Sequence, residues 1–113
     1  MKYMMLIVSD PDAADRPSDP AVDPVEDWVA KHDGSGKRLD GQRLRPPESA
    51  TTIRRRGGEL LITDGPFTET REWIAGFDIL ECDDLDEAIA IASTHPMSAA
   101  GTIEVRPFWP YEG

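Results

Sequence analysis

The sequence has one cysteine, two histidines and few basic residues, and each scarcity removes a class of protein. Cys82 alone allows neither an internal disulfide nor a cysteine-rich zinc site, which fits a reducing, cytoplasmic compartment. Twelve lysines and arginines stand against 22 acidic residues, a net charge of −10, so we expect no nucleic-acid-binding face. No apolar run approaches the length of a membrane span. The 113 residues therefore predict one soluble, cytoplasmic domain, 1–113, without nucleic-acid or membrane partners.

The familiar catalytic motifs are also missing. The stretch 34–37 (Gly-Ser-Gly-Lys) follows a predicted helix instead of joining a strand to one, so it is not a phosphate-binding loop. No serine stands in a nucleophile elbow. His32 and His95 have no acidic residue at metal-ligand spacing. We expect no metal and no cofactor, and whether the chain is an enzyme stays open.

Two short helices are predicted. The first starts at Asp23-Pro24, where Asp23 caps the helix and Pro24 takes its first position, and the second starts at the capping box 84–87. Helical spacing predicts one buried stripe on each: Val25, Trp28, Val29 and His32 on the first, and Leu85, Ala88, Ile89 and Ala92 on the second. His32 is then a partly buried residue at a helix end. His95 lies at the end of the second stripe, either as a structural cap or as a site residue.

The strands predict an α+β fold. Residues 3–8 and 74–82 are apolar on both alternating faces, as in central strands, and 102–108 form the last strand. A hairpin of 51–56 and 59–63 turns at Gly57-Gly58, with Ile53 facing Ile62 and Arg56 facing Glu59. Residues 37–47 contain a short extended piece with a turn at 40–41, and 9–24 form an acidic, Pro-rich loop without regular structure. The order is βαββαβ-like, with an inserted β-hairpin and an apolar second sheet face that favours a second subunit.

The segment 64–72 (Asp-Gly-Pro-Phe-Thr-Glu-Thr-Arg-Glu) combines turn residues with charged and hydroxyl groups at mid-chain. Together with residues near strand and helix ends, it suggests a small-molecule site near the ends of the sheet. His95 and Asp78 are the candidate catalytic pair, since histidine with a carboxylate performs acid–base chemistry near neutral pH. Asp78 is equally explained by a buried ion pair. The candidate ligand-binding residues are Asp64, Arg71, Phe67, Trp73, Trp28 and Asp40.

The segment 64–72 resembles the signature of the DGPF proteins, a branch of the YCII-related family that commonly has lysine where Arg71 stands. The likeness also covers 1–4, 39–41, 45–52, 73–77, 84–88 and 103–108. The resemblance implies a ferredoxin-like fold that dimerises through its sheets into an α/β-barrel-like assembly. It implies no established reaction.

The suspicion of catalysis in this family rests on a histidine early in the first helix and an aspartate before a proline after the second helix. Here Val25 and Glu26 occupy the first place and His95 the second, so the pair is not reproduced. Members of the branch often accompany extracytoplasmic-function sigma factors. The function is therefore not established: a homodimer with a small-molecule-binding cleft is one expectation, and a non-enzymatic regulatory module that uses 64–72 for recognition is the alternative. In a third, structural interpretation, residues 64–72 shape a turn and a dimer contact.

Overall fold

A computed structural model describes residues 1–111 as a four-stranded sheet with helices, plus a separate hairpin. The helices and strands are, in chain order, β1 (Lys2–Ser9), α1 (Val25–Gly34), β2 (Arg38–Arg43), β3 (Thr51–Arg56), β4 (Glu59–Asp64), β5 (Trp73–Glu81), α2 (Leu85–Ser93), α3 (Met97–Ala100) and β6 (Thr102–Pro107). Two short 3-10 turns, Ala13–Asp15 and Pro47–Ser49, lie in the connections.

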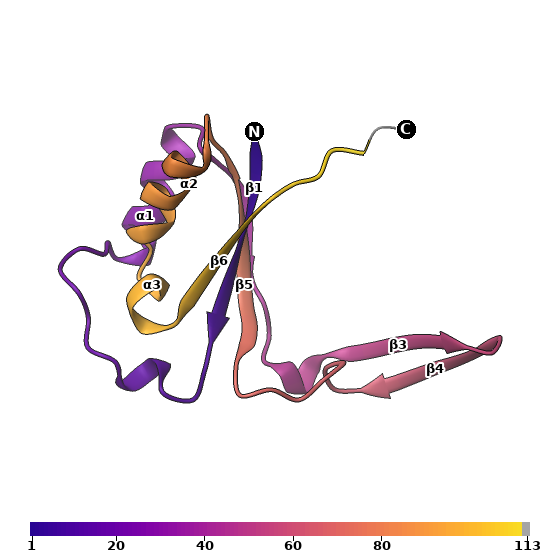
Figure 1. The fold of residues 1–113 in the computed structure, drawn as a ribbon. Helices are drawn as coiled ribbons and strands as arrows, with labels where there is room; N and C mark the ends of the chain where they lie inside the picture. Colours follow the sequence, from indigo (N-terminus) through magenta and orange to yellow (C-terminus); the bar gives the residue numbers. More distant parts are fainter. Residues whose placement is uncertain (112–113) are drawn as a thin grey trace.

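The sheet has the order β2-β5-β1-β6, and every neighbouring pair is antiparallel. The helices lie on one of its faces (Figure 1). This mixed α+β arrangement is compatible with a ferredoxin-like fold. The predicted turn at 40–41 is wrong: Arg38–Arg43 is one strand, and its irregularity between Arg38 and Asp40 is a local shift of register against β5.

The core lies between the sheet and the helices, because alternate strand residues point to that side. Tyr3, Met5 and Leu80 supply the sheet side. The helices add Trp28, Ala88, Ile91 and Ala92. The predicted stripes are wrong at their edges: the buried line of α2 runs through Ala88, Ile91 and Ala92, so Leu85 and Ile89 are 48% and 50% exposed, and Val25 on α1 is 43% exposed.

The starts of the two helices differ from each other. Asp84 caps α2 as predicted, because its carboxylate accepts a hydrogen bond from the Glu87 backbone N–H at 2.9 Å. The predicted cap at Asp23 is wrong, since α1 begins at Val25 after Pro24 without a side-chain cap. Instead, the Asp23 backbone N–H donates to the Thr94 carbonyl at 2.8 Å. This bond ties the start of α1 to the end of α2.

The loop 9–24 and the hairpin are peripheral. Ser9 belongs to β1 and residues 13–15 form a 3-10 turn, so the loop is less irregular than predicted. β3 and β4 pair in the predicted register around Gly57 and Gly58, whose φ values of 57° and 80° suit a tight hairpin turn. The hairpin projects away from the sheet, on the side opposite the helices (Figure 1).

Candidate functional site

A buried ion pair lies on the helix-facing side of the sheet. Asp78 of β5 is 5% exposed, and its Oδ1 accepts a hydrogen bond from Arg38 Nε at 2.7 Å. The outer end of the same guanidinium donates from Nη1 to Asp33 Oδ1 at 2.9 Å, at the end of α1. Burial raises the pKa of Asp78, and the Arg38 pair offsets part of that rise. The result is a chain of charges from the half-exposed Asp33 to the buried Asp78.

Gly41 makes room for this pair. It lies opposite Asp78 in the register of β2 and β5. An added Cβ would collide with Asp78 Oδ1 and come within 2.5 Å of Arg38 Nη2. Because the two charged groups fill the space above Gly41, a larger residue would force them apart. The glycine therefore has a steric role at this position.

His95, at the turn between α2 and α3, is 4% exposed. Its Nδ1 accepts a hydrogen bond from the Met97 backbone N–H at 3.0 Å, so the proton of the neutral ring is on Nε2. Burial, and to a smaller extent the positive charge of Arg38, lowers the pKa of His95 to about 4. At neutral pH His95 is therefore an uncharged imidazole whose Nε2–H can donate.

Trp28 connects this region to a second histidine. The indole ring meets His95 edge-on at a centroid distance of 4.7 Å and His32 at 4.9 Å. Its Nε1 donates to the Ile91 carbonyl at 2.9 Å, which fixes the ring between the helices. Burial, and then Lys31, lowers the pKa of His32. Within residues 1–111, His32 Nε2 is a buried atom without a hydrogen-bond partner.

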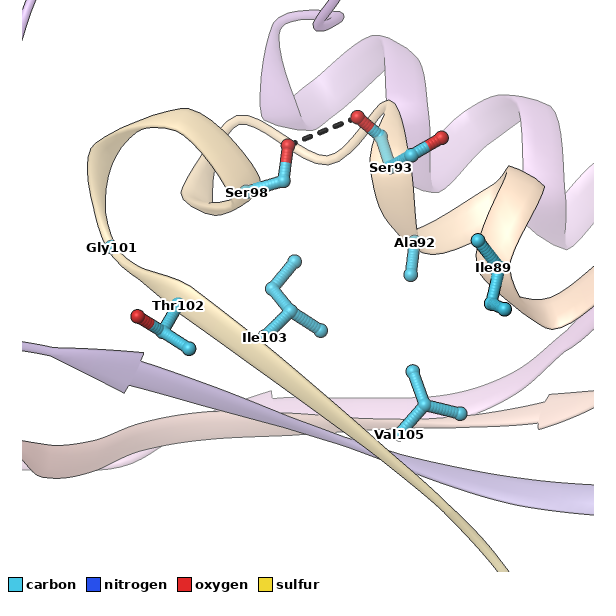
Figure 2. A pocket seen from close by; sticks show the side chains of 8 residues that line it. All are labelled: Ile89, Ala92, Ser93, Ser98, Gly101, Thr102, Ile103 and Val105. Atoms are coloured by element: carbon cyan, nitrogen blue, oxygen red, sulfur yellow. Dashed lines mark hydrogen bonds between the residues drawn. The ribbon is translucent and has the colours of Figure 1, made fainter.

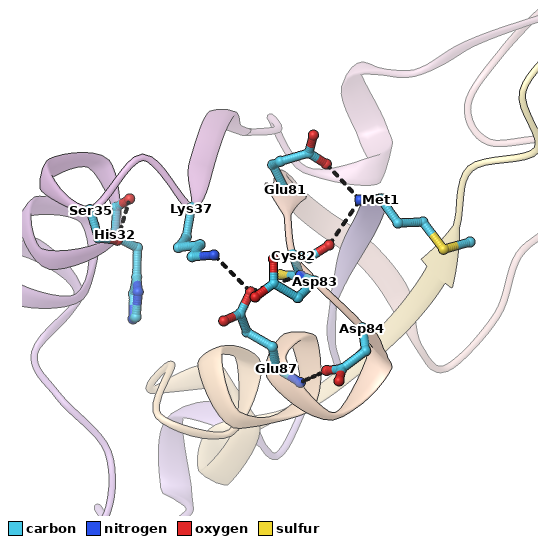
Figure 3. Close-up of polar contacts among 9 residues, drawn as sticks. All are labelled: Met1, His32, Ser35, Lys37, Glu81, Cys82, Asp83, Asp84 and Glu87. Atoms are coloured by element: carbon cyan, nitrogen blue, oxygen red, sulfur yellow. Dashed lines mark hydrogen bonds and ion pairs between the residues drawn. The ribbon is translucent and has the colours of Figure 1, made fainter.

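Two hollows lie beside these groups. The larger, of about 430 Å³, separates α2 and α3 from β6; Figure 2 shows its lining of Ile89, Ala92, Ser93, Ser98, Gly101, Thr102, Ile103 and Val105. The other, of about 330 Å³, lies between α1 and α2, where Lys37 Nζ meets Glu87 Oε1 at 2.9 Å (Figure 3). Neither hollow is lined by Asp78 or His95. The Asp78 and His95 side chains are themselves almost fully buried in this conformation.

The cysteine beside the second hollow is not activated. Cys82 is 1% exposed, and burial raises the pKa of its thiol. Met1 and Glu81 pair nearby through the N-terminal amine at 3.1 Å (Figure 3). The thiol is thus a small core group.

The structure separates the predicted site residues into two groups. Trp28, Asp78 and His95 lie on the helix side of the sheet. The others lie elsewhere. Asp40 is exposed on the opposite sheet face, and Trp73 is half-buried at the start of β5. Asp64 is exposed at the end of β4, and Phe67 and Arg71 are exposed in the loop that follows it. The Arg71 side chain binds neither Asp78 nor His95: its Nη2 donates to Asp12 Oδ2 at 2.9 Å.

Arg38 is the residue that the sequence analysis missed. Its charge partners, Asp33 and Asp78, are 5 and 40 residues away in the chain, so no local motif joins the three. The available signal was the lone carboxylate in a strand that is apolar on both faces, because such a group needs a cationic partner. Choosing that partner required the pairing of β2 with β5.

Fold and site together define a small α+β protein with a buried, partly charged centre between its sheet and its helices. A family model described as the YCII-related domain matches residues 1–112. The chain therefore belongs to the YCII-related family. It is also similar to an uncharacterized protein of Rhizobium meliloti (strain 1021), with 38% identity over 84 residues, a match that covers 73% of this chain and 68% of that protein. Among residues 1–111, no helix is long and apolar enough to span a membrane.

Proposed function

We propose that this protein binds a small molecule at His95, Arg38 and Asp78, and that the site transfers a proton. The observation that carries the proposal is a neutral histidine whose tautomer is set by the Met97 N–H, beside a buried ion pair. Buried titratable groups with altered pKa values in one place are typical of functional sites. The pKa values of Asp78 and His95 are shifted in opposite directions. The raised pKa of Asp78 favours its protonated acid, and the lowered pKa of His95 favours its neutral base.

The ligand that fits these groups carries an oxygen acceptor, such as a carbonyl or a carboxylate. His95 Nε2–H donates one hydrogen bond to it, and Arg38 supplies positive charge. Asp78 is then the candidate general base, held by Arg38 until the ligand competes for the guanidinium. Because both buried residues are closed from solvent, entry requires movement of the side chains around Arg38. The partly exposed Asp33 end of the ion chain is the natural opening.

A titration followed by NMR tests this site. Pyruvate, which has both a ketone and a carboxylate, is added to the labelled protein, with sodium chloride at matched ionic strength as the control. We expect shifts at His95, Asp78 and Arg38 in the wild type and their loss in the double variant His95→Ala/Asp78→Ala. Acetate and acetone, which carry only the carboxylate or only the ketone, are titrated in the same way. The proposed site is wrong if the variant binds these compounds as the wild type does. It is also wrong if none of the three compounds shifts the wild-type resonances.

We also propose that the protein is a cytoplasmic homodimer, as expected for the DGPF branch, and that the sheets face each other. The sheet face without helices carries the cross-strand pairs Leu6–Phe77 and Met4–Ile79, all partly exposed. A second copy covers such a face economically, since it presents the same apolar patch across a two-fold axis. Sedimentation equilibrium tests this: Phe77→Ser should weaken the dimer.

A second candidate function is recognition by the segment 64–72. Phe67 is 74% exposed there, and Arg71 of the same segment is exposed as well, which favours a contact with another protein. The partner suggested by the family resemblance is an extracytoplasmic-function sigma factor. A pull-down with that factor, repeated after scrambling residues 64–72, tests this idea, and unchanged capture would remove it.

A further inference from the structure

The hairpin of β3 and β4, residues 51–64, which we call the arm, has little to hold it on its own chain. Ile53 and Ile62 lie directly opposite each other and are 66% and 64% exposed. Leu60 and Leu61 are exposed as well, at 48% and 41%. An isolated two-stranded hairpin is at best marginally stable in water. An arm with this much apolar surface therefore needs a surface to pack on.

The arm does not pack on the sheet and helices of its own chain. The radius of gyration is 16.3 Å, against about 13 Å for a compact chain of this length. The extents are 49 × 44 × 19 Å, so the molecule is wide and thin. In Figure 1 the arm runs out from the lower end of the sheet, on the side away from the helices. It therefore borders the space in front of the helix-free sheet face.

Charge indicates what fills that space. The arm contains Arg54, Arg55 and Arg56 against Glu59 and Asp64, so its net charge is +1. Because the whole chain has a net charge of −10, the residues outside the arm have a net charge of −11. Within residues 1–111 none of the three arginines forms a salt bridge, and they donate to backbone carbonyls instead, as Arg54 does to Phe67 at 2.9 Å. The predicted pairing of Arg56 with Glu59 exists in the strand register but not as an ion pair.

An acidic surface with an apolar patch is the partner that suits this arm, and a second copy of the chain offers both. Its body carries the opposite charge, and its helix-free sheet face adjoins the arm when two sheets face each other. A two-fold axis makes the contact reciprocal, so that two arms are covered at once and the assembly closes.

We propose that the arm is a clasp, which packs Ile53 and Ile62 on a second copy of this chain and places its arginines against that copy's acidic surface. The proposal rests on the homodimer proposed above and adds to it the element that stabilises the dimer. It assigns a role to the basic run 54–56, which otherwise is a solvated hairpin tip.

Sedimentation equilibrium of the full chain and its variants tests the clasp. We expect Ile53→Ser/Ile62→Ser to raise the dimer Kd at least about tenfold, since two apolar anchors are lost from the interface. The matched control is Leu85→Ser/Ile89→Ser, a similarly exposed apolar pair on α2, which should leave Kd within about twofold. Changing all three arginines to glutamate should weaken the dimer and remove much of its salt dependence. Far-UV circular dichroism checks that each variant is folded.

The outcomes separate the clasp from the dimer itself. If the wild type and both arm variants dimerise equally while Phe77→Ser does not, the sheet contact stands and the clasp is wrong. If the wild type is a monomer at every concentration, both are wrong. Binding of single-stranded RNA by a monomeric wild type, lost in the arginine variant, would likewise overturn the clasp.

Cross-linking supplies a readout that does not depend on variant stability. A photoreactive maleimide is attached at Glu59→Cys, near the arm tip, and Cys82 does not compete because it is buried. In a mixture of isotopically light and heavy chains, we expect cross-links that join a light peptide to a heavy one. Cross-links confined to a single chain would contradict the clasp.

Discussion

The burial of an uncharged His95 predicts that the protein loses stability as pH falls toward 4. In the unfolded chain the pKa of this imidazole is 6.5, and in the folded protein burial lowers the pKa to about 4. At pH values between these two pKa values, His95 is protonated in the unfolded state and neutral in the native state. The stability that depends on neutral His95 is therefore complete above pH 6.5 and is lost as pH falls through the window to about 4.

The size of the effect follows from the same two values. The gap between 6.5 and about 4, at about 1.4 kcal/mol for each pH unit, gives about 3.5 kcal/mol in the free energy of unfolding, of which about 3 kcal/mol is lost by pH 4. His95 is 4% exposed, so solvent screens little of this. Total stabilities of small domains are about 5–15 kcal/mol, so the loss is a large fraction.

The assay is urea unfolding followed by tryptophan fluorescence from pH 4 to 8, on the wild type and on His95→Asn. Asparagine removes the titration, and its side-chain oxygen can accept the Met97 N–H in place of Nδ1. At any single pH, the difference in free energy of unfolding between the two proteins includes the cost of the substitution itself. The change of that difference with pH reports the titration of His95 alone. Asp78 and His32 also titrate abnormally but are present in both proteins, so they cancel to first order. We expect the wild type to lose about 3 kcal/mol relative to the variant as pH falls from 6.5 to 4. Parallel curves would refute the desolvated, neutral His95.

Two further predictions concern the ion pair. Arg38→Met should lower the free energy of unfolding by about 3 kcal/mol at pH 7, because Asp78 is left buried without its cation. The control Arg71→Met breaks an exposed pair and should lower it by less than about 1 kcal/mol. Equal losses in the two variants would contradict the burial argument. Gly41→Ala should lower the free energy of unfolding by about 2 kcal/mol, because the new Cβ enters the space of the ion pair. The control Gly34→Ala should not destabilise the protein, since nothing lies within 4 Å of the Cβ that it adds. Both comparisons use the same urea midpoints, and a neutral Gly41→Ala would mean that the pair has room to move.

Local patterns predicted the elements that depend on neighbouring residues. The Gly57-Gly58 hairpin and the Asp84 cap were visible because the interacting groups lie within a few positions of each other. The α2 stripe was misjudged at Leu85 and Ile89, since a short alanine-rich helix can rotate by a residue and still bury an apolar line. The cap at Asp23 failed for another reason: the N-cap position of α1 is held by Pro24, one residue later than predicted, and the Asp23 backbone N–H bonds to Thr94.

The candidate site depended on information that local patterns do not contain. Asp78 and His95 attracted attention because each is a polar residue in an apolar setting. Arg71 attracted attention as a charged residue near a predicted strand end, but position in the sequence does not show which way a side chain points. The chain places Arg71 beyond the hairpin, where it meets Asp12.

The position of Arg38 shows how the topology creates the site. β2 belongs to the first half of the chain and β5 to the second, and their antiparallel pairing sets Gly41 opposite Asp78. The register irregularity after Arg38 leaves both Arg38 and Gly41 on the helix-facing side, where an arginine would ordinarily be excluded. There it is acceptable because Asp78 and Asp33 supply two carboxylates and Gly41 supplies the space. A shift of one residue in the pairing would turn the guanidinium to the other face and leave Asp78 alone in the core. The register of β2 against β5 is therefore the structural feature on which the proposed site depends most.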